Sequence, residues 1–268
     1  MKPYRVFAVL RREMQEIVKS RGLLLAIFLP ALFLTLLPLG GIAFLGRALD
    51  NVSSGDAQDF ARLLTMMPEL KMWSVGEVAS YVILEQFLTM FLMMPLIISL
   101  SLASQSVISE KQTKSLEPLL ATPIRTSELL LGKGLTAMLP ALAATWVAFL
   151  IFLLAGRLLI DSPRVYSSLL QPKWLVAMLA LAPLLSLLSV SITVVLSSRV
   201  NDARTVQQIG GFVVLPIVIL GVAQTVGLLL LNVTTFVIGA IILAAADILI
   251  LRLGVRLFQR EKILTRWK

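Results

Sequence analysis

The sequence predicts an all-α protein that crosses a membrane six times and has both termini in the cytoplasm. Hydrophobic residues make up 58% of the 268 residues and charged residues only 15%, whereas soluble domains carry about 25% charged residues. The mean hydropathy is +0.92. Long stretches lack any charge, and Lys and Arg are distributed unevenly between them. We therefore expect one transmembrane domain over residues 1–268, surrounded by a lipid bilayer.

The first 21 residues predict an amphipathic helix on the cytoplasmic membrane surface. A basic amphipathic helix beside a span lies in the interface, with its apolar side toward the lipid. The basic segment and the apolar run after it are both too long for a cleaved signal peptide. The apolar side has helical spacing and comprises Phe7, Leu10, Met14 and Ile17. The opposite side comprises Arg11, Arg12, Glu13, Glu16 and Lys19.

Six apolar segments are long enough to span the bilayer, which takes about 20 residues. Residues 209–246 contain no charge, and as one helix they would be about 57 Å long, against a hydrocarbon core of about 30 Å. This stretch must fold back somewhere in Gln224–Thr235, and we leave open a re-entrant turn there. The predicted spans are about 22–46, 82–104, 135–156, 174–198, 209–230 and 233–254.

The distribution of basic residues supports six spans. With the N-terminus inside, the cytoplasmic segments hold 18 of the 24 Lys and Arg residues and the outer segments hold 6, whereas five spans would give 12 and 12. Cytoplasmic loops carry the excess of positive charge. This bias explains the net charge of +9 without a nucleic-acid partner, and it predicts a multi-pass protein of the cell membrane.

The second span carries two local signals. Ser74 and Glu77 have the spacing of a capping box, which predicts a helix start outside the lipid. Pro95 and, in the third span, Pro140 are predicted to kink their helices. The loop of residues 105–134 joins the second and third spans, and we expect it on the cytoplasmic side.

Small and hydroxyl side chains predict close packing of the third and fourth spans. Small residues at helical spacing let another helix approach, and hydroxyls usually bond their own helix or a neighbour. Lining of a pathway is the alternative for the hydroxyls. The small residues are Ala137, Ala141, Ala144 and Ala148, and the hydroxyl residues are Ser186, Ser189, Ser191 and Thr193.

Residue types exclude several chemistries. The chain has no cysteine and no histidine, which excludes disulfides, Cys/His zinc sites and His-based catalytic groups. The nearest string to a Walker A motif, residues 130–134, lacks its first glycine and its Ser/Thr, and no G-x-G-x-x-G occurs. We predict no catalytic residue, no metal site and no bound cofactor in this chain, which is not expected to be an enzyme.

Two carboxylates within spans, Glu85 and Asp247, are candidate intramembrane polar sites. Asp247 shares a helix face with Ala240 and Ala244, and we expect it to face protein. We expect Glu85 to be an interfacial charge that reaches water. A functional ionic role is the alternative for both. The expected partners of Asp247 are Arg199, Arg204 and Arg252.

The loop of residues 105–134 is the most informative segment. Three leucines make an apolar edge among charged residues, and Pro118 and Pro123 interrupt it. A short amphipathic helix beneath a membrane bundle can be a docking surface for a partner, although a plain connector would explain the spacing equally well. The leucines are Leu116, Leu119 and Leu120.

This loop resembles the inner loop of the type-2 class of ABC exporter permeases, which includes drug, polysaccharide and sodium-export permeases. The family pattern is an E-K/R pair, then T/S-L-E-x-L-L-x-x-P, then E-L-x-x-G-K. It is matched here by Glu110-Lys111, by residues 115–123 and by residues 128–133, with Ser115 in place of the usual threonine. Arg11-Arg12-Glu13 is similar to the R-K/R-E-L opening of the same family.

The resemblance implies a transmembrane subunit of an ATP-driven exporter. Such a subunit forms a homodimer, or pairs with a related permease, and couples to two separate ABC ATPase subunits that bind ATP and Mg²⁺. The substrate would cross at the dimer interface, along the second and fifth spans. The ATPase would bind Glu110, Lys111, Ser115, Leu116, Glu117, Pro118, Leu119, Leu120, Pro123 and Lys133.

Two other functions stay open at this point. A permease-like membrane module could transmit the work of an ATPase to an assembly or maturation partner. An ion-coupled secondary transporter could use Glu85 or Asp247 as its titrating group. For the exporter, Gly210, Gly211, Pro216 and Gly221 provide deformable points on the fifth span.

Overall fold

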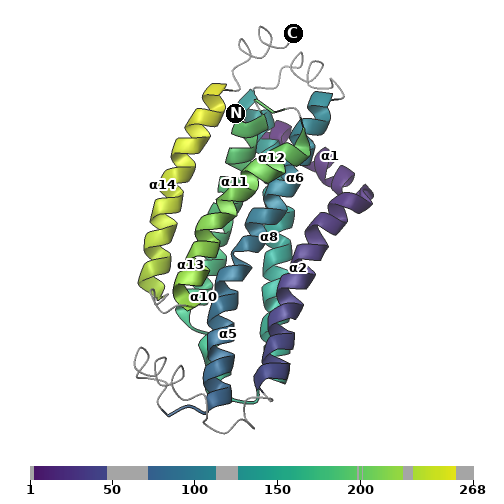
Figure 1. The fold of residues 1–268 in the computed structure, drawn as a ribbon. Helices are drawn as coiled ribbons and strands as arrows, with labels where there is room; N and C mark the ends of the chain where they lie inside the picture. The colour runs from purple at the N-terminus through teal and green to yellow at the C-terminus, as the bar shows by residue number, and fades with distance from the viewer. Residues whose placement is uncertain are drawn as a thin grey trace.

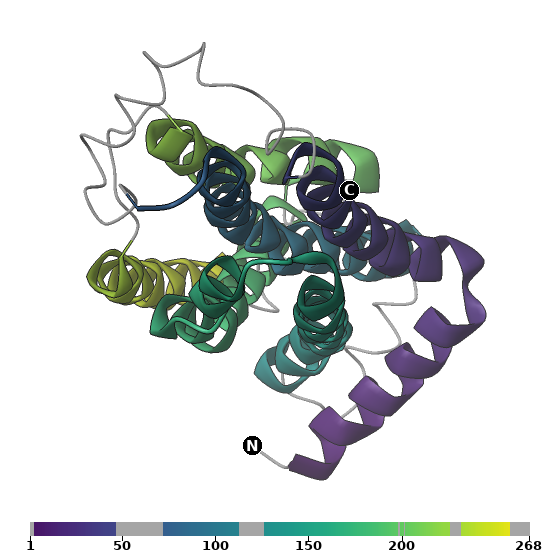
Figure 2. The ribbon, with the colours of Figure 1, turned by 90° about the horizontal axis from the view of Figure 1, so that it is seen from below.

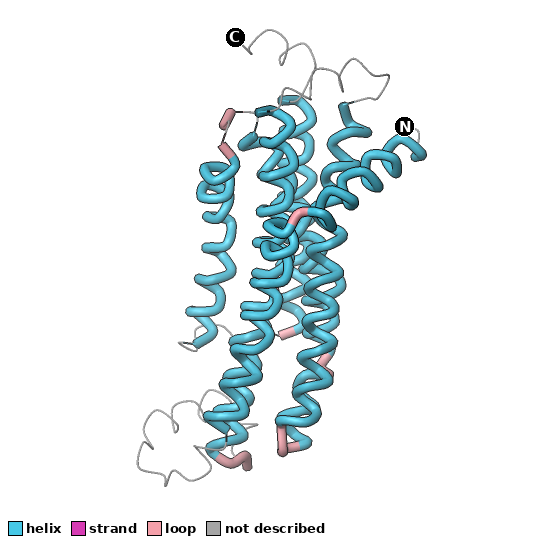
Figure 3. The backbone as a smooth tube through the Cα atoms, turned by 90° about the vertical axis from the view of Figure 1, so that its right-hand side faces the viewer, coloured by secondary structure: helices cyan, strands magenta, loops and turns pink. Residues whose placement is uncertain are grey.

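Six helical segments of the protein are long and apolar enough to cross a membrane. The structure is a computed structural model, which describes residues 3–46, 72–112, 126–197, 199–200, 202–225 and 232–257. Every regular element in these ranges is helical (Figure 3), which confirms the all-α, six-span prediction. The segments are Arg21–Phe44, Val75–Ile108, Leu131–Leu159, Pro163–Ser197, Ala203–Gln224 and Val233–Arg252.

The N-terminal helix meets the first span at a sharp corner. Helix α1 (Pro3–Lys19) ends one residue before α2 (Arg21–Gly41), which continues as a π-helical turn, η1 (Ile42–Gly46). Ser20 has extended backbone angles, and its hydroxyl accepts a hydrogen bond from the Leu23 amide at 3.4 Å. This N-cap satisfies one of the free amides that start a helix. Viewed along the spans, α1 lies crosswise to them (Figure 2).

The second span consists of two helices, α5 (Val75–Phe91) and α6 (Met93–Gln112). The predicted capping box is confirmed: the Glu77 amide donates to the Ser74 hydroxyl, and the Ser74 amide donates to the Glu77 carboxylate. Pro95 has no amide hydrogen to donate to the carbonyl four residues earlier. The regular hydrogen bonding is therefore interrupted at Leu92, whose backbone angles stay helical, and α5 and α6 together form one span, Val75–Ile108, with a local irregularity next to Pro95.

The third and fourth spans supply much of the core. Helix α8 (Thr126–Leu159) has 34 residues, so it is about 51 Å long and extends beyond a hydrocarbon core of about 30 Å. The fourth span comprises α9 (Pro163–Leu169), α10 (Pro172–Val176), the π-helical η3 (Ala177–Leu181) and α11 (Ala182–Ser197). The Trp174 ring packs on the rings of Phe91, Phe149 and Phe152, with centroids 5.5–6.4 Å away.

The predicted break after the fifth span is confirmed. Helices α12 (Ala203–Gly211) and α13 (Leu215–Thr225) are joined by the 3₁₀ turn η4 (Phe212–Val214), and the sixth span is α14 (Val233–Leu257). The re-entrant turn that we left open lies outside the described residues. Asp202 caps α12, and its pKa is lowered because the Thr205 amide, then the Thr205 hydroxyl, donate to its carboxylate.

Helices α6, α8 and α11 form the centre of the bundle, α2 packs on α6 and α8, and α14 packs on α11 (Figure 1). The start of α1 and the end of α14 lie at the same end of the bundle (Figure 1). The predicted packing of small residues is confirmed, because Ala137, Ala141 and Ala148 are buried and the partly buried Ala144 packs against the same core.

The hydroxyl residues of the fourth span also pack as expected. Ser186 hydrogen-bonds to Ser99 across the α6–α11 contact, and Ser189 donates to the Leu96 carbonyl at 3.0 Å. Ser191 and Thr193 donate to carbonyls four residues earlier in their own helix. All four hydroxyl residues are buried: Ser186 and Ser189 join α11 to α6, Ser191 and Thr193 bond their own helix, and none of the four lines an open pathway in this structure.

Candidate functional site

The second span ends and the third begins at the same end of the bundle as α1 (Figure 1). Helix α6 reaches Gln112 and α8 begins at Thr126, so two helices frame residues 113–125. Glu110 and Lys111 lie on the last turns of α6, and their side chains are outside the described part of the structure. The other predicted ATPase contacts also lie outside the described residues: Ser115, Leu116, Glu117, Pro118, Leu119, Leu120 and Pro123.

Lys133, the last of the predicted contacts, is buried near the start of α8. Its side chain forms an ion pair with Glu13 of α1 at 3.3 Å. The ammonium also donates to the Ser106 hydroxyl at 3.0 Å and to the Ser106 carbonyl at 3.3 Å. The Ser106 hydroxyl in turn donates to the other Glu13 oxygen at 2.7 Å. We call Glu13, Ser106 and Lys133 the inner cluster, and it joins α1, α6 and α8.

Glu13 corrects one expectation. The spacing of α1 put this residue on the charged, outward side, but only 7% of its surface is exposed. Helix α1 packs against the first turns of α8 and follows directly into α2, so part of its polar side faces protein. A buried carboxylate requires a partner, and Lys133 and Ser106 supply the opposite charge and a hydrogen bond.

The apolar side of α1 is divided between protein and surroundings. Ile17 is buried in the core, Leu10 and Met14 are partly buried, and Phe7 is 65% exposed. Ile17, Leu10 and Met14 thus attach α1 to the bundle. Phe7 remains available for the membrane surface, as expected of an interfacial helix, and this lipid contact stays a prediction.

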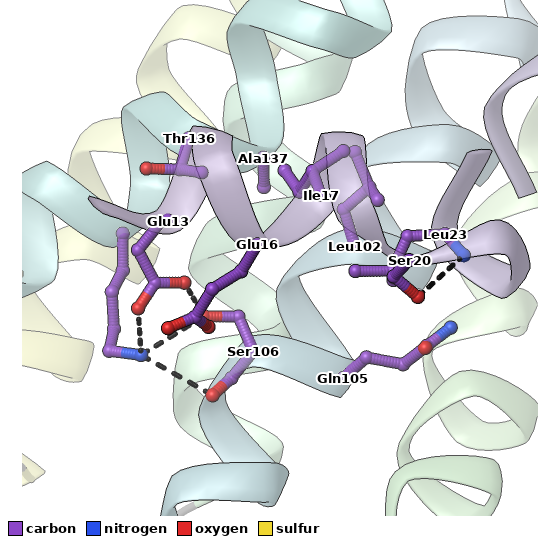
Figure 4. A pocket seen from close by; sticks show the side chains of 11 residues that line it. Glu13, Glu16, Ile17, Ser20, Leu23, Leu102, Gln105, Ser106, Thr136 and Ala137 are labelled. Atoms are coloured by element: carbon purple, nitrogen blue, oxygen red, sulfur yellow. Dashed lines mark hydrogen bonds and ion pairs between the residues drawn. The ribbon is translucent and has the colours of Figure 1, made fainter. Parts of the chain in front are cut away.

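A pocket of about 160 Å³ lies beside the inner cluster (Figure 4). Its wall is polar at Glu13, Glu16, Gln105 and Ser106, whereas the side toward the spans is apolar and includes Leu102. Thr136 also lines the pocket, and its hydroxyl donates a hydrogen bond to the Gly132 carbonyl at 2.8 Å. Because residues of α1 and of α6 both line it, the pocket lies between these two helices, on one side of the inner cluster.

Glu85 is buried at the opposite end of the bundle. The expectation that it reaches water is wrong, because only 6% of its surface is exposed. Its carboxylate forms an ion pair with Lys173 of α10, which is equally buried. The Lys173 ammonium also lies 5.6 Å from the centre of the Tyr81 ring. Lys173 was not among the predicted sites, because the sequence placed it in an outer loop.

Asp247 is buried in α14 without the arginine that we expected. Its exposed fraction is 2%, and neither carboxylate oxygen has a hydrogen-bond partner among the described residues. Arg199, Arg204 and Arg252 have exposed side chains instead. Helix α14 packs mainly on α11, whose residues 182–197 contain no charged side chain.

The described residues contain no group of three or more His, Cys, Asp or Glu side chains that could hold a metal ion. Convergent acid, base and nucleophile groups are also missing from the two charged clusters, which each pair one carboxylate with one lysine. The arrangement is that of a polytopic membrane protein with internal ion pairs near both ends of a helical bundle.

The family of this membrane protein follows from comparison with known families. The family model described as ABC-2 family transporter protein matches residues 74–247, well over half of the chain. The chain therefore belongs to the ABC-2 transporter family, and it is a multi-pass permease of the cell membrane. No protein in a search of curated sequences matched it.

Proposed function

We propose that this chain is the membrane subunit of an ATP-driven exporter, which works as a dimer and is driven by separate ATPase subunits. The family assignment supports a transport subunit. The observation that carries the finer proposal is the framing of residues 113–125 by two helices, α6 and α8, which continue past the apolar spans. A partner that displaces these residues would move the ends of both helices and so both spans.

ATPase binding at the loop is supported by the sequence that the two helices present. Residues 106–133 contain the charged, apolar and proline positions of the type-2 exporter pattern in their usual order. ATP and Mg²⁺ would bind on the partner, since this chain lacks a Walker A motif. The excess of basic residues in the segments on this side of the bundle supports a cytoplasmic position for the loop.

Transport would follow from a change between two packings of the spans. Binding of ATP favours one arrangement of the ATPase dimer, and a ligand shifts such an equilibrium by its differential affinity for the two states. Two places in the bundle can absorb the change: the helix break at Leu92 and the 3₁₀ turn η4 (Phe212–Val214). Leu92 lies on the second span and η4 on the fifth. These two spans contact each other through the Thr89–Gln224 hydrogen bond of 3.1 Å.

The surface of α13 supports a dimer whose interface carries the pathway. Val218, Ile219 and Val222 are exposed apolar side chains on this helix, and the second span behind it is largely buried. A second copy, or a related permease, would cover this face and enclose the second and fifth spans. The transported compound is not specified by these apolar surfaces.

Charge reversal in the loop tests the proposal. Tagged chain carrying Glu117→Lys should reach the membrane at the wild-type level but retain at least about tenfold less ATPase, because losing one partner of an interfacial charge pair commonly costs 2 kcal/mol or more. Glu69→Lys, the same reversal in the predicted outer loop, is the matched control and should retain the ATPase. Equal amounts of bound ATPase in all three samples would exclude docking at this loop.

A further inference from the structure

The inner cluster joins three helices that are far apart in the sequence. Glu13 belongs to α1, Ser106 to the end of α6 and Lys133 to the start of α8. Four contacts of 2.7–3.3 Å connect their side chains and the Ser106 carbonyl. Helices α6 and α8 are the two that frame residues 113–125, and α1 leads into the first span through the single residue Ser20.

From this geometry we infer that Glu13 and Lys133 are positioning residues for coupling: their ion pair fixes α1 to the helices that frame the loop, so that a displacement of the loop also moves the first span. The inference rests on the proposed function for the source of the displacement. The mechanical connection itself is a property of this chain, and it can be measured without an ATPase.

Burial makes this ion pair a strong connection. The side chains of Lys133 and Glu13 are 6% and 9% exposed, so removing Lys133 leaves the buried Glu13 carboxylate without this counter-charge, which is strongly destabilising. Helix α1 offers a matched comparison in the Arg12–Glu16 pair, which has the same separation of 3.3 Å but side chains that are 59% and 58% exposed. Exposed pairs of this kind contribute little.

A close backbone contact next to Lys133 reinforces the connection. A Cβ atom placed on Gly132 would lie 2.9 Å from Cβ and Cγ1 of Val9 and 3.4 Å from the Val6 carbonyl oxygen. Because Gly132 has no side chain, α1 lies directly on the first turns of α8. The glycine contact and the ion pair hold α1 at neighbouring positions, so the helix cannot roll without breaking one of them.

The absence of cysteine from the whole sequence permits a direct test with a single reporter. Ile17 is buried at the end of α1, so Ile17→Cys should react slowly with a membrane-impermeant maleimide in inside-out vesicles. Adding Glu13→Gln should raise the labelling rate by about tenfold or more, since the ion pair that joins α1 to α8 is lost and the freed helix exposes the reporter. Glu16→Gln, the matched control, should leave the rate within about twofold.

A reversed pair keeps the test valid if Glu13→Gln fails to accumulate. The combination of Glu13→Lys with Lys133→Glu restores opposite charges at the same two positions, so it should accumulate and label slowly, whereas Glu13→Lys alone should not. Slow labelling of Glu13→Gln, equal to that of Glu16→Gln, would show that the ion pair does not hold α1. Fast labelling of the reversed pair would also show that the ion pair does not hold α1.

A second reporter tests the coupling step. Ile42 is buried near the far end of the first span, and in the complex with ATPase the labelling rate of Ile42→Cys should change on addition of ATP. Glu13→Gln should retain the ATPase but lose this change, and Glu16→Gln should keep it. An unaltered ATP response in Glu13→Gln would overturn the coupling role. If no ATPase copurifies with any variant, the proposed function fails, while the Ile17 reporter still decides whether the pair fixes α1.

Discussion

Two buried carboxylates within the spans have opposite surroundings. Glu85 of α5 pairs with Lys173, and a tyrosine ring lies beside the same ammonium group. Asp247 of α14 is at least as buried, but both of its oxygens lack a partner among the described residues. A buried charge without a partner is costly, and within a membrane it is a functional-site hypothesis by default. The comparison makes Glu85 part of the scaffold and leaves Asp247 as the unexplained group.

Position in the bundle accounts for the difference. Glu85 lies on a span that is largely buried among other helices, so a lysine from the fourth span can reach it. Helix α14 lies at the edge of the bundle and only 11% of its apolar window is buried, so few elements can supply a partner. Its main neighbour, α11, has no charged side chain, and the hydroxyls of Ser189, Ser191 and Thr193 on α11 donate to backbone carbonyls.

The largest change in stability is expected when the Glu85–Lys173 ion pair is broken. Lys173→Met should destabilise the protein by about 3–5 kcal/mol, because Glu85 is then buried without a counter-charge. Thermal unfolding of the detergent-purified chain measures this loss. The double variant Lys173→Met/Glu85→Met should recover most of the stability, since an apolar pair of similar volume replaces the ions. Equal stability of Lys173→Met and wild type would show that Glu85 does not depend on Lys173.

At Asp247 we expect a substitution to raise the stability of the protein instead of lowering it. Asp247→Leu should stabilise the protein by about 1–3 kcal/mol, because it removes an unpaired buried polar group. The same unfolding assay applies, with Asp247→Asn as the control that keeps the shape and the polarity. A loss of stability in Asp247→Leu would mean that Asp247 has a partner outside the described residues or in a second copy of the chain.

The smallest effect is expected at the ring beside Lys173. Tyr81→Leu should cost about 0.5–2 kcal/mol, the contribution of a cation–π contact at a partly to fully desolvated site. In the Lys173→Met background the same substitution should cost less, so a double-mutant cycle isolates the contact. Identical costs in both backgrounds would show that Tyr81 contributes through packing alone, including its edge contact with Trp73.

Much of the fold could be predicted from local sequence. The spans, the Ser74–Glu77 capping box and the break before α14 follow from hydropathy, spacing and length, which are properties of neighbouring residues. Helical periodicity also identified the side of α1 that holds Ile17 against the core. These features need no knowledge of which helices become neighbours.

The partners of the charged residues could not be predicted in this way. Glu13 and Lys133 are 120 positions apart, and Glu85 and Lys173 are 88 apart. Spacing along one helix states which residues share a face but not which other helix covers that face. Glu13 was therefore placed with the exposed charges, Lys173 was placed in a loop, and Asp247 was given an arginine that the structure does not bring to it.

The central claim is that this permease works as a dimer with separate ATPase subunits. Native mass spectrometry of the tagged chain, extracted from its own membranes in mild detergent, tests it most directly. The claim predicts a complex of two permease chains, identical or related, with two soluble chains that carry Walker motifs. A chain that runs alone, in a detergent that keeps a known ABC complex intact, would contradict it and would make Asp247 the first residue to test for an ion-coupled mechanism.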